Sequence, residues 1–138
     1  MALFKGMRYH PHMAFESITH LSALAVSTER IGLIATASTT HHEPYNLARQ
    51  FASLDPISNR RAGWNVVTAG SREEADNFGH RRVDHDARYV RAAEFIQVAR
   101  QLWDSWDDHA LVIDQSAGTW GRGDLVNPIK HVGDHFQV

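Results

Sequence analysis

Residues 30–68 read RIGLIATASTTHHEPYNLARQFASLDPISNRRAGWNVVT, and they contain the clearest secondary-structure pattern of the chain. Residues 31–36 are a short run of apolar and β-branched side chains, which predicts a strand buried on both faces. Residues 62–67 form a second such run, and residues 44–54 between them have a helical pattern. Strand, helix and strand in this order predict a right-handed βαβ unit with parallel strands.

The helical pattern between the two strands has a defined beginning and end. Pro44 suits the first helical position, where its missing N–H has no helical partner to lose. Apolar side chains then share one face at helical spacing: Leu47, Ala48, Phe51 and Leu54. Asp55 and Pro56 are expected to end the helix.

Polar side chains lie at the C-terminal ends of both predicted strands. They are Thr36, Ser38, Thr39 and Thr40 at the first strand, and Asn65 and Thr68 at the second. Because neighbouring parallel strands lie about 4.8 Å apart, these groups are expected to lie close together at the C-terminal edge of the sheet, which we call its mouth. This edge is the usual ligand position in an α/β sheet or barrel. Alternatively, the Thr and Ser side chains only end a strand or cap the next helix. Spacing alone leaves both interpretations open.

Helical patterns also precede and follow the βαβ unit. Residues 15–28 form the first, with Ile18, Leu21, Ala25 and Val26 on one face. Ser71 caps a short helix that stops near Asn77. The order helix, strand, helix, strand favours a parallel sheet with helices outside it.

The longest predicted helix covers residues 84–106, with Asp84 or His85 as its cap. One apolar stripe contains Tyr89, Ala92, Ala93, Ile96, Ala99 and Trp103, and Phe95, Val98, Leu102 and Trp106 widen it. His85 and Tyr89 are four residues apart and share a face at the helix N-terminus, which suits a phosphate. The alternative is a helix cap followed by a core tyrosine.

Composition excludes several classes of protein. The 138 residues are 43% apolar and 22% charged with a net charge of −2, which is typical of one globular domain and gives no basic surface for nucleic acid. No apolar run approaches the roughly 20 residues that span a membrane. The absence of cysteine and of a secretory signal in residues 1–15 fits a cytoplasmic protein.

Ten histidines are a high number, yet their spacing matches no metal motif. His131 and His135 are four apart but flank Gly133 and Asp134, which indicate a turn rather than a helix. Most histidines are therefore expected to be solvated. A small metal-binding module built from His and carboxylate ligands stays open as a less favoured alternative.

The domain organisation predicted from the sequence is incomplete. Residues 1–14 form a leader without periodicity, residues 15–138 form one unit, and residues 110–138 are an insertion-like segment broken by glycines. Residues 131–138 resemble the first arm of a hairpin whose partner arm is missing. Only two strands are convincing, whereas a complete β/α barrel needs about 250 residues, so the chain is expected to be a piece of something larger.

The stretch from Thr28 to Thr68 resembles the large component of two-component, flavin-dependent monooxygenases of the luciferase-like branch. This branch includes nitrilotriacetate, EDTA, dibenzothiophene-sulfone and long-chain alkane monooxygenases. The resemblance continues through EADNFG, HDARYVRAAEF, LWDSWDDHALV and NPIKHVGDHFQV, and so covers residues 15–138. It implies an α/β fold that is part of a TIM-like β/α barrel, with about two of its eight strands.

The resemblance also implies a cofactor site and a reaction. Thr36 resembles a threonine at the flavin ring, Asn65 a polar residue lining the same pocket, and His85 and Tyr89 the pair that binds the flavin phosphate. Reduced FMN would arrive by diffusion from a separate NAD(P)H:flavin reductase. With O₂, it would place one oxygen atom in a small organic substrate and leave the other as water. No catalytic acid or base need come from this segment.

Three hypotheses follow for the chain. The first is an FMN-dependent monooxygenase of the component A type, truncated in this sequence. The second is a non-catalytic remnant whose exposed strand edges and apolar faces make it a homo-oligomer. The third is the histidine-based metal module.

Overall fold

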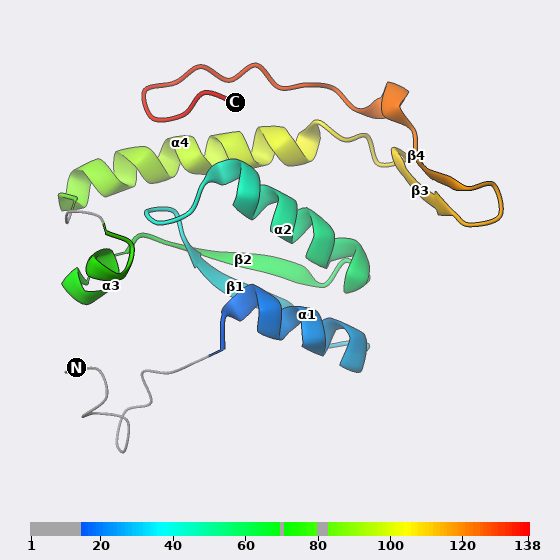
Figure 1. The fold of residues 1–138 in the computed structure, drawn as a ribbon, viewed down its shortest axis with the longest axis horizontal. Helices are drawn as coiled ribbons and strands as arrows, with labels where there is room; N and C mark the ends of the chain where they lie inside the picture. The colour runs from blue at the N-terminus through cyan, green and yellow to red at the C-terminus, as the bar shows by residue number, and fades with distance from the viewer. Residues whose placement is uncertain (1–14, 70, 80–82) are drawn as a thin grey trace.

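The computed structural model describes residues 15–69, 71–79 and 83–138 (Figure 1). The predicted leader and most of the arginine-rich loop at residues 80–83 therefore lie outside the described residues. In chain order the elements are α1 (Ser17–Ser27), β1 (Leu33–Ser38), α2 (Pro44–Ile57), β2 (Ala62–Val67), α3 (Arg72–Asn77), α4 (His85–Asp104), β3 (Leu111–Asp114), β4 (Thr119–Gly121) and a 3₁₀ turn, η1 (Gly123–Leu125).

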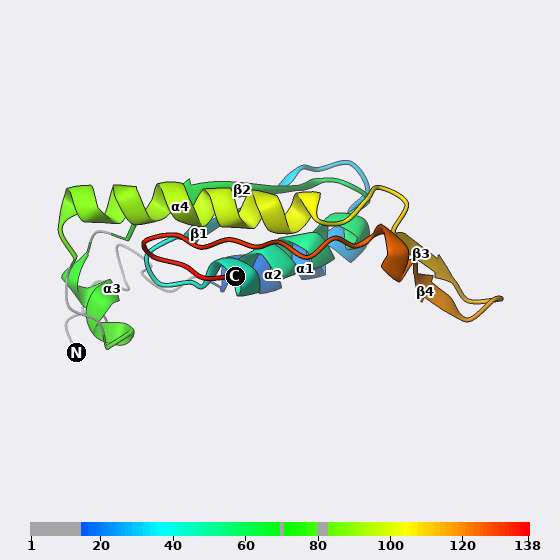
Figure 2. The same ribbon diagram turned by 90° about the horizontal axis from the view of Figure 1, so that it is seen from above.

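The predicted βαβ unit is confirmed. β1 and β2 pair in parallel, with a register that runs from Leu33 opposite Ala62 to Ser38 opposite Val67. α1 and α2 cover one face of this sheet, and α4 lies beside it against α2 (Figure 2). The C-terminal ends of both strands and the N-terminal end of α4 lie at the same end of the molecule (Figure 1).

The prediction that the first strand is buried on both faces is wrong. Leu33, Ala35 and Ala37 are buried under the helices, whereas Ile34 is 67% exposed and Thr36 is also exposed. Successive strand side chains point to opposite faces, and among the described residues helices cover only one of them. We call the uncovered side, with Ile34, Thr36 and Asn65, the open face.

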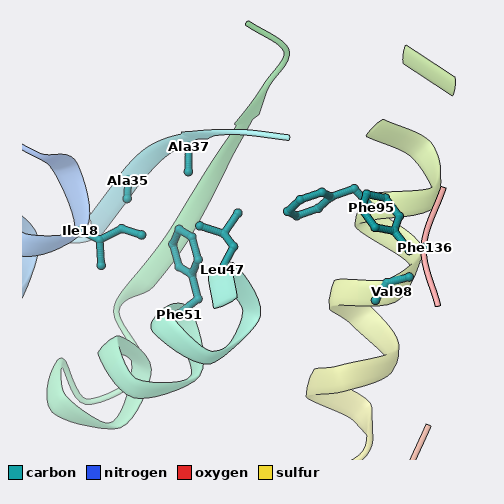
Figure 3. Close-up of a cluster of buried hydrophobic side chains, with 8 residues drawn as sticks. All are labelled: Ile18, Ala35, Ala37, Leu47, Phe51, Phe95, Val98 and Phe136. Carbon is teal, nitrogen blue, oxygen red and sulfur yellow. The ribbon is translucent and has the colours of Figure 1, made fainter. Parts of the chain in front are cut away.

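The core lies between the sheet, α2 and α4 (Figure 3). It contains Ile18, Ala35, Ala37, Leu47, Phe51, Phe95, Val98 and Phe136. Trp64 and Trp103 pack against this cluster, and their indole N–H groups donate to the carbonyl oxygens of Ala37 at 3.0 Å and Ala48 at 2.9 Å. Bulky aromatic rings therefore join α4 to the βαβ unit without leaving indole donors unsatisfied.

The apolar faces of two helices differ from the predicted ones. In α1, Ile18 and Ala25 are buried but Val26 is 76% exposed. In α4 the buried residues are Arg88, Ala92, Phe95, Val98 and Ala99, while Tyr89 and Ala93 from the predicted stripe are exposed. α4 is buried on the side that meets α2 and the C-terminal residues, and apolar periodicity alone did not distinguish this side from its neighbour.

α2 begins at Pro44 as predicted and buries the whole predicted face. It does not end at Asp55, however, because Pro56 is accommodated in its last turn and the helix continues to Ile57. Asn59 and Arg60 then take left-handed backbone conformations with φ of 56° and 61°, and this reverses the chain into β2. A proline near the end of a helix removes only one helical hydrogen bond, so α2 ends later than the predicted residue 54.

The C-terminal region contains two hairpins. β3 and β4 form an antiparallel pair that the sequence did not predict. Residues 131–138, which we call the C-terminal hairpin, close on themselves through paired backbone hydrogen bonds between His131 and Val138 at 2.8 and 3.0 Å. From the sequence, the second arm of this hairpin is expected to be missing, but both arms lie within residues 131–138. Within the described residues, no helix is long and apolar enough to cross a membrane.

Candidate functional site

Two of the predicted site residues meet on the open face. Thr36 and Asn65 are opposite each other in the parallel register, and Nδ2 of Asn65 donates to Oγ1 of Thr36 at 3.1 Å. Both residues are exposed. The carbonyl oxygen of Thr36 accepts from Oγ of Ser17 at 2.8 Å, which ties the start of α1 to this point of β1. The pair is therefore a fixed polar group on an otherwise apolar strand surface.

The other hydroxyls at the strand ends serve the backbone. Oγ of Ser38 accepts from the N–H groups of Thr40 and Ala69, and Oγ1 of Thr40 also accepts from Ala69, all at 3.1 Å. Oγ1 of Thr39 donates to the carbonyl oxygen of Val67 at 3.3 Å. For these three residues the structural interpretation holds, because their hydroxyls join the end of β1 to the end of β2. Thr36 is the hydroxyl of this group that faces solvent.

His85 and Tyr89 lie together at the first turn of α4. Their ring centroids are 4.8 Å apart and both residues are exposed, Tyr89 by 57%. Asp84 caps the helix by accepting from the N–H of Asp86 at 3.2 Å, and the carboxylate of Asp86 lies 3.0 Å from Nδ1 of His85. The predicted cap is confirmed, whereas the alternative of a core tyrosine is wrong. Among the described residues, no hydrogen bond or ring contact joins this pair to Thr36 and Asn65.

Arg91 connects α4 to the loop after β1 and was not predicted from the sequence. Its guanidinium donates to the carbonyl oxygens of Thr39 and, at 3.4 Å, His42, and it lies 3.9 Å from the carboxylate of Glu43. We call residues 39–43 the mouth loop. Burial lowers the pKa of Arg91, and nearby Glu43 and Glu94 oppose this effect without cancelling it. Arginine nevertheless stays cationic in proteins.

The same guanidinium also faces two aromatic rings. Its central carbon lies 4.6 Å from the ring centroid of Phe136 and 5.8 Å from that of Phe95. Cations are attracted to the faces of aromatic rings at such distances. Arg91 therefore bridges the mouth loop and the C-terminal hairpin.

Glu94 holds the C-terminal hairpin on α4. Its carboxylate accepts from Nε2 of His131 at 3.0 Å and from the backbone N–H groups of His135 at 3.0 Å and Phe136 at 2.9 Å. Burial raises the pKa of Glu94, but the hydrogen bonds from His131, Phe136 and His135 outweigh it and hold the pKa below its ordinary value. The side chain of His131 is only 8% exposed, so this histidine is an exception to the expectation that most histidines are solvated.

A weak signal for this pair was present in the sequence. Arg91 and Glu94 are charged residues three apart, surrounded by Ala92, Ala93 and Phe95 in a helix that packs into the core. Long charged residues in such a position need partners from another element. Within the described ranges, no group of three His, Asp or Glu residues is arranged to hold a metal ion.

Comparison with known proteins places the chain in a family. Residues 4–138 match the luciferase-like monooxygenase family. The chain belongs to this family. It is 51% identical over 133 residues to nitrilotriacetate monooxygenase component A of Aminobacter aminovorans, covering 96% of this chain and 29% of that protein. It is 47% identical over 132 residues to N-acetyl-S-(2-succino)cysteine monooxygenase of Bacillus subtilis, covering 94% and 30%.

Solved structures of relatives share the fold. The crystal structure of DmoA from Hyphomicrobium sulfonivorans superimposes with a TM-score of 0.82 at 34% identity, covering 96% of this chain and 29% of that one. Riboflavin lyase, solved with modified FMN and riboflavin, superimposes with a TM-score of 0.81 at 37% identity, covering 91% and 28%. The chain thus spans less than a third of each relative. The predicted α/β fold, part of a TIM-like barrel, is confirmed.

Proposed function

We propose that the chain is part of an FMN-dependent monooxygenase of the component A type. Reduced FMN is supplied by a separate NAD(P)H:flavin reductase, and with O₂ it supplies the oxygenating chemistry for a small organic substrate. The residues proposed to contact the cofactor are Thr36 and Asn65 at the ring, and His85 and Tyr89 at the phosphate. Membership of the luciferase-like monooxygenase family supports this proposal.

The observation that carries the proposal is the hydrogen bond between Asn65 and Thr36 on the open face. Because Oγ1 of Thr36 accepts this bond, its own hydrogen remains to donate, and Oδ1 of Asn65 remains to accept. A flavin ring has carbonyl oxygens and N–H groups along one edge and apolar faces elsewhere. One donor and one acceptor beside the exposed side chain of Ile34 match this chemistry.

The first turn of α4 supplies groups that suit a phosphate. The hydroxyl of Tyr89 donates to an anion, and so does Nε2–H of His85 in its protonated form, while Nδ1 faces Asp86. The N-terminal end of a twenty-residue helix adds partial positive charge. Asp86 opposes this effect, since its carboxylate is exposed beside the imidazole. These residues fit a phosphate through hydrogen bonds rather than through net charge.

The test is thermal unfolding by circular dichroism under anaerobic conditions with dithionite-reduced FMN or reduced riboflavin. Reduced FMN is expected to raise the unfolding temperature by mass action. Thr36→Val should weaken the binding of both reduced FMN and reduced riboflavin, because the hydroxyl contacts the flavin ring that they share. His85→Gln and Tyr89→Phe should weaken the binding of FMN and leave the binding of riboflavin unchanged, because riboflavin has no phosphate.

Histidine 20, exposed on α1, provides the matched control. His20→Gln should bind both flavins as the parent chain does. An unfolding temperature that neither flavin changes would contradict the proposal, as would His85 and Tyr89 variants that lose riboflavin and FMN equally.

A second candidate is a non-catalytic remnant that self-associates. The observation in its favour is the open face, where Ile34 is 67% exposed beside strand edges that no other described strand covers. Ile34→Thr should then shift the chain from oligomer to monomer in sedimentation, with flavin neither binding nor changing the state. A monomeric parent chain that binds reduced FMN would exclude this candidate.

A further inference from the structure

Arg91 lies where two segments far apart in the sequence meet. It donates to carbonyl oxygens of Thr39 and His42 in the mouth loop, and its guanidinium also faces the ring of Phe136 in the C-terminal hairpin. The side chain of Arg91 is only 23% exposed, so these contacts take the place of water. Its orientation therefore depends on both segments.

Glu94, one helical turn after Arg91, binds the C-terminal hairpin to α4 through hydrogen bonds. The hairpin runs beside α4 in Figures 1 and 2, and its contact with the carboxylate is close at Gly133. A Cβ at this glycine would collide with the carboxylate of Glu94 and with the ring of His131. The backbone of the hairpin is thus fixed against Glu94, and this contact places Phe136 over the guanidinium of Arg91.

The mouth loop continues directly from the strand that carries Thr36. Its first residues also hold the chain at the end of β2: the hydroxyl of Thr39 donates to the carbonyl oxygen of Val67, and the hydroxyl of Thr40 accepts from the N–H of Ala69. A change in this loop therefore alters how the ends of β1 and β2 are held together, next to the pair formed by Thr36 and Asn65.

Resting on the proposed function, we propose that Arg91 is a positioning residue for the flavin site, and that the C-terminal hairpin docked by Glu94 keeps Arg91 in place. When the hairpin is docked, Phe136 shields one side of the guanidinium, and its donors are directed to the mouth loop. When the hairpin is released, this side is open to water and the two carbonyl bonds weaken. Among the described residues, the charged and titratable groups around Arg91 and Glu94 include Glu43 and His42 in the mouth loop, and His131 and His135 on the hairpin.

Hydrogen–deuterium exchange of the full chain tests this coupling without any ligand. Glu94→Gln is expected to speed amide exchange in residues 131–138 by about tenfold, because it weakens the hydrogen bonds that seat the hairpin. The same variant should also speed exchange in residues 39–43, although Glu94 makes no hydrogen bond to them. Arg91→Met should speed exchange in both segments, and Arg91→Lys, which keeps the charge but not the forked donors, should restore part of the protection.

Arg100 and Asp104 provide matched controls, because both are exposed on the same helix. Arg100→Met and Asp104→Asn should leave both segments unchanged. Release of residues 131–138 in Glu94→Gln without any change in residues 39–43 would overturn the proposal. So would an Arg91→Met variant with a protected mouth loop.

Titration with reduced riboflavin separates this inference from the proposed function. If the parent chain binds flavin, Glu94→Gln and Arg91→Met should weaken binding several-fold, and Arg100→Met should not. If the parent chain binds no flavin, the proposed function fails while exchange in the two segments still decides whether they are coupled. Flavin binding that all variants retain unchanged would overturn the positioning role alone.

Discussion

Nε2 of His131 lies 3.0 Å from Oε1 of Glu94, and the side chains are only 8% and 13% exposed. The same oxygen accepts from the backbone of Phe136 at 2.9 Å. A carboxylate that receives several hydrogen bonds is favoured in its ionised form, in agreement with the lowered pKa of Glu94. The contact between α4 and the C-terminal hairpin is therefore sensitive to acid.

We expect Glu94 to stabilise the fold only while it is ionised. Its pKa in the folded chain lies below the ordinary value of 4.5, so its contribution is fully present above that pH and is lost as the pH falls through the folded-state pKa. Unfolding temperatures of the parent chain and Glu94→Gln should differ at neutral pH and converge in acid. Glu16, Asp114 and Asp124 also have lowered pKa values, but they are present in both proteins and their effects cancel. A difference that persists unchanged at acid pH would contradict this assignment.

Gly133→Ala should destabilise the C-terminal hairpin. The added Cβ would collide with the carboxylate of Glu94, which is fixed by its hydrogen bonds, so either these bonds or the hairpin must yield. We expect a loss of about 1–3 kcal/mol in the free energy of unfolding, measured by urea denaturation. Gly32→Ala is the control, because a Cβ there meets nothing within 4 Å. Equal effects of the two substitutions would show that the close contact at Gly133 does not matter.

Among the arginines of the βαβ unit, we expect replacement of Arg61 to cause the largest loss in the free energy of unfolding. Its guanidinium donates to the carbonyl oxygens of Ala25, Thr28 and Ile31, each at 2.8 Å, and so holds the end of α1 and the entry to β1. Arg61→Lys loses the forked donors and is expected to cost about 1–3 kcal/mol of unfolding free energy. Arg60→Lys makes the same chemical change on the exposed neighbouring residue and should be nearly neutral. Thermal unfolding of both variants measures the difference.

Elements with strong local patterns were predictable from the sequence. β2 has the predicted bounds, α2 begins at Pro44, and the caps at Ser71 and Asp84 form the expected hydrogen bonds. The parallel pairing followed from strand length and the helical connection. Local periodicity and capping chemistry determine these features, so residues close together in the sequence are enough to predict them.

Features that depend on distant segments were not predictable. The burial of β1 on one face only, the side of α4 that enters the core and the pairing of Glu94 with His131 all depend on which elements meet in space. The candidate site shows the same limit. Spacing placed Thr36 beside Asn65, but it did not show that Ser38, Thr39 and Thr40 are engaged by the backbone, nor that Arg91 holds the mouth loop.

Ile113→Asn should stabilise the hairpin formed by β3 and β4. Ile113 has φ of 50°, a left-handed conformation that strains a β-branched residue, and its side chain is 49% exposed. Asparagine adopts this conformation more readily, so we expect a gain of about 1 kcal/mol in the free energy of unfolding. Val112→Asn is the control, because Val112 is 43% exposed in the same strand and does not have positive φ. If Ile113→Asn instead destabilises the chain as much as Val112→Asn, the apolar side chain of Ile113 contributes more than its backbone costs, and relief of strain is excluded as the dominant effect.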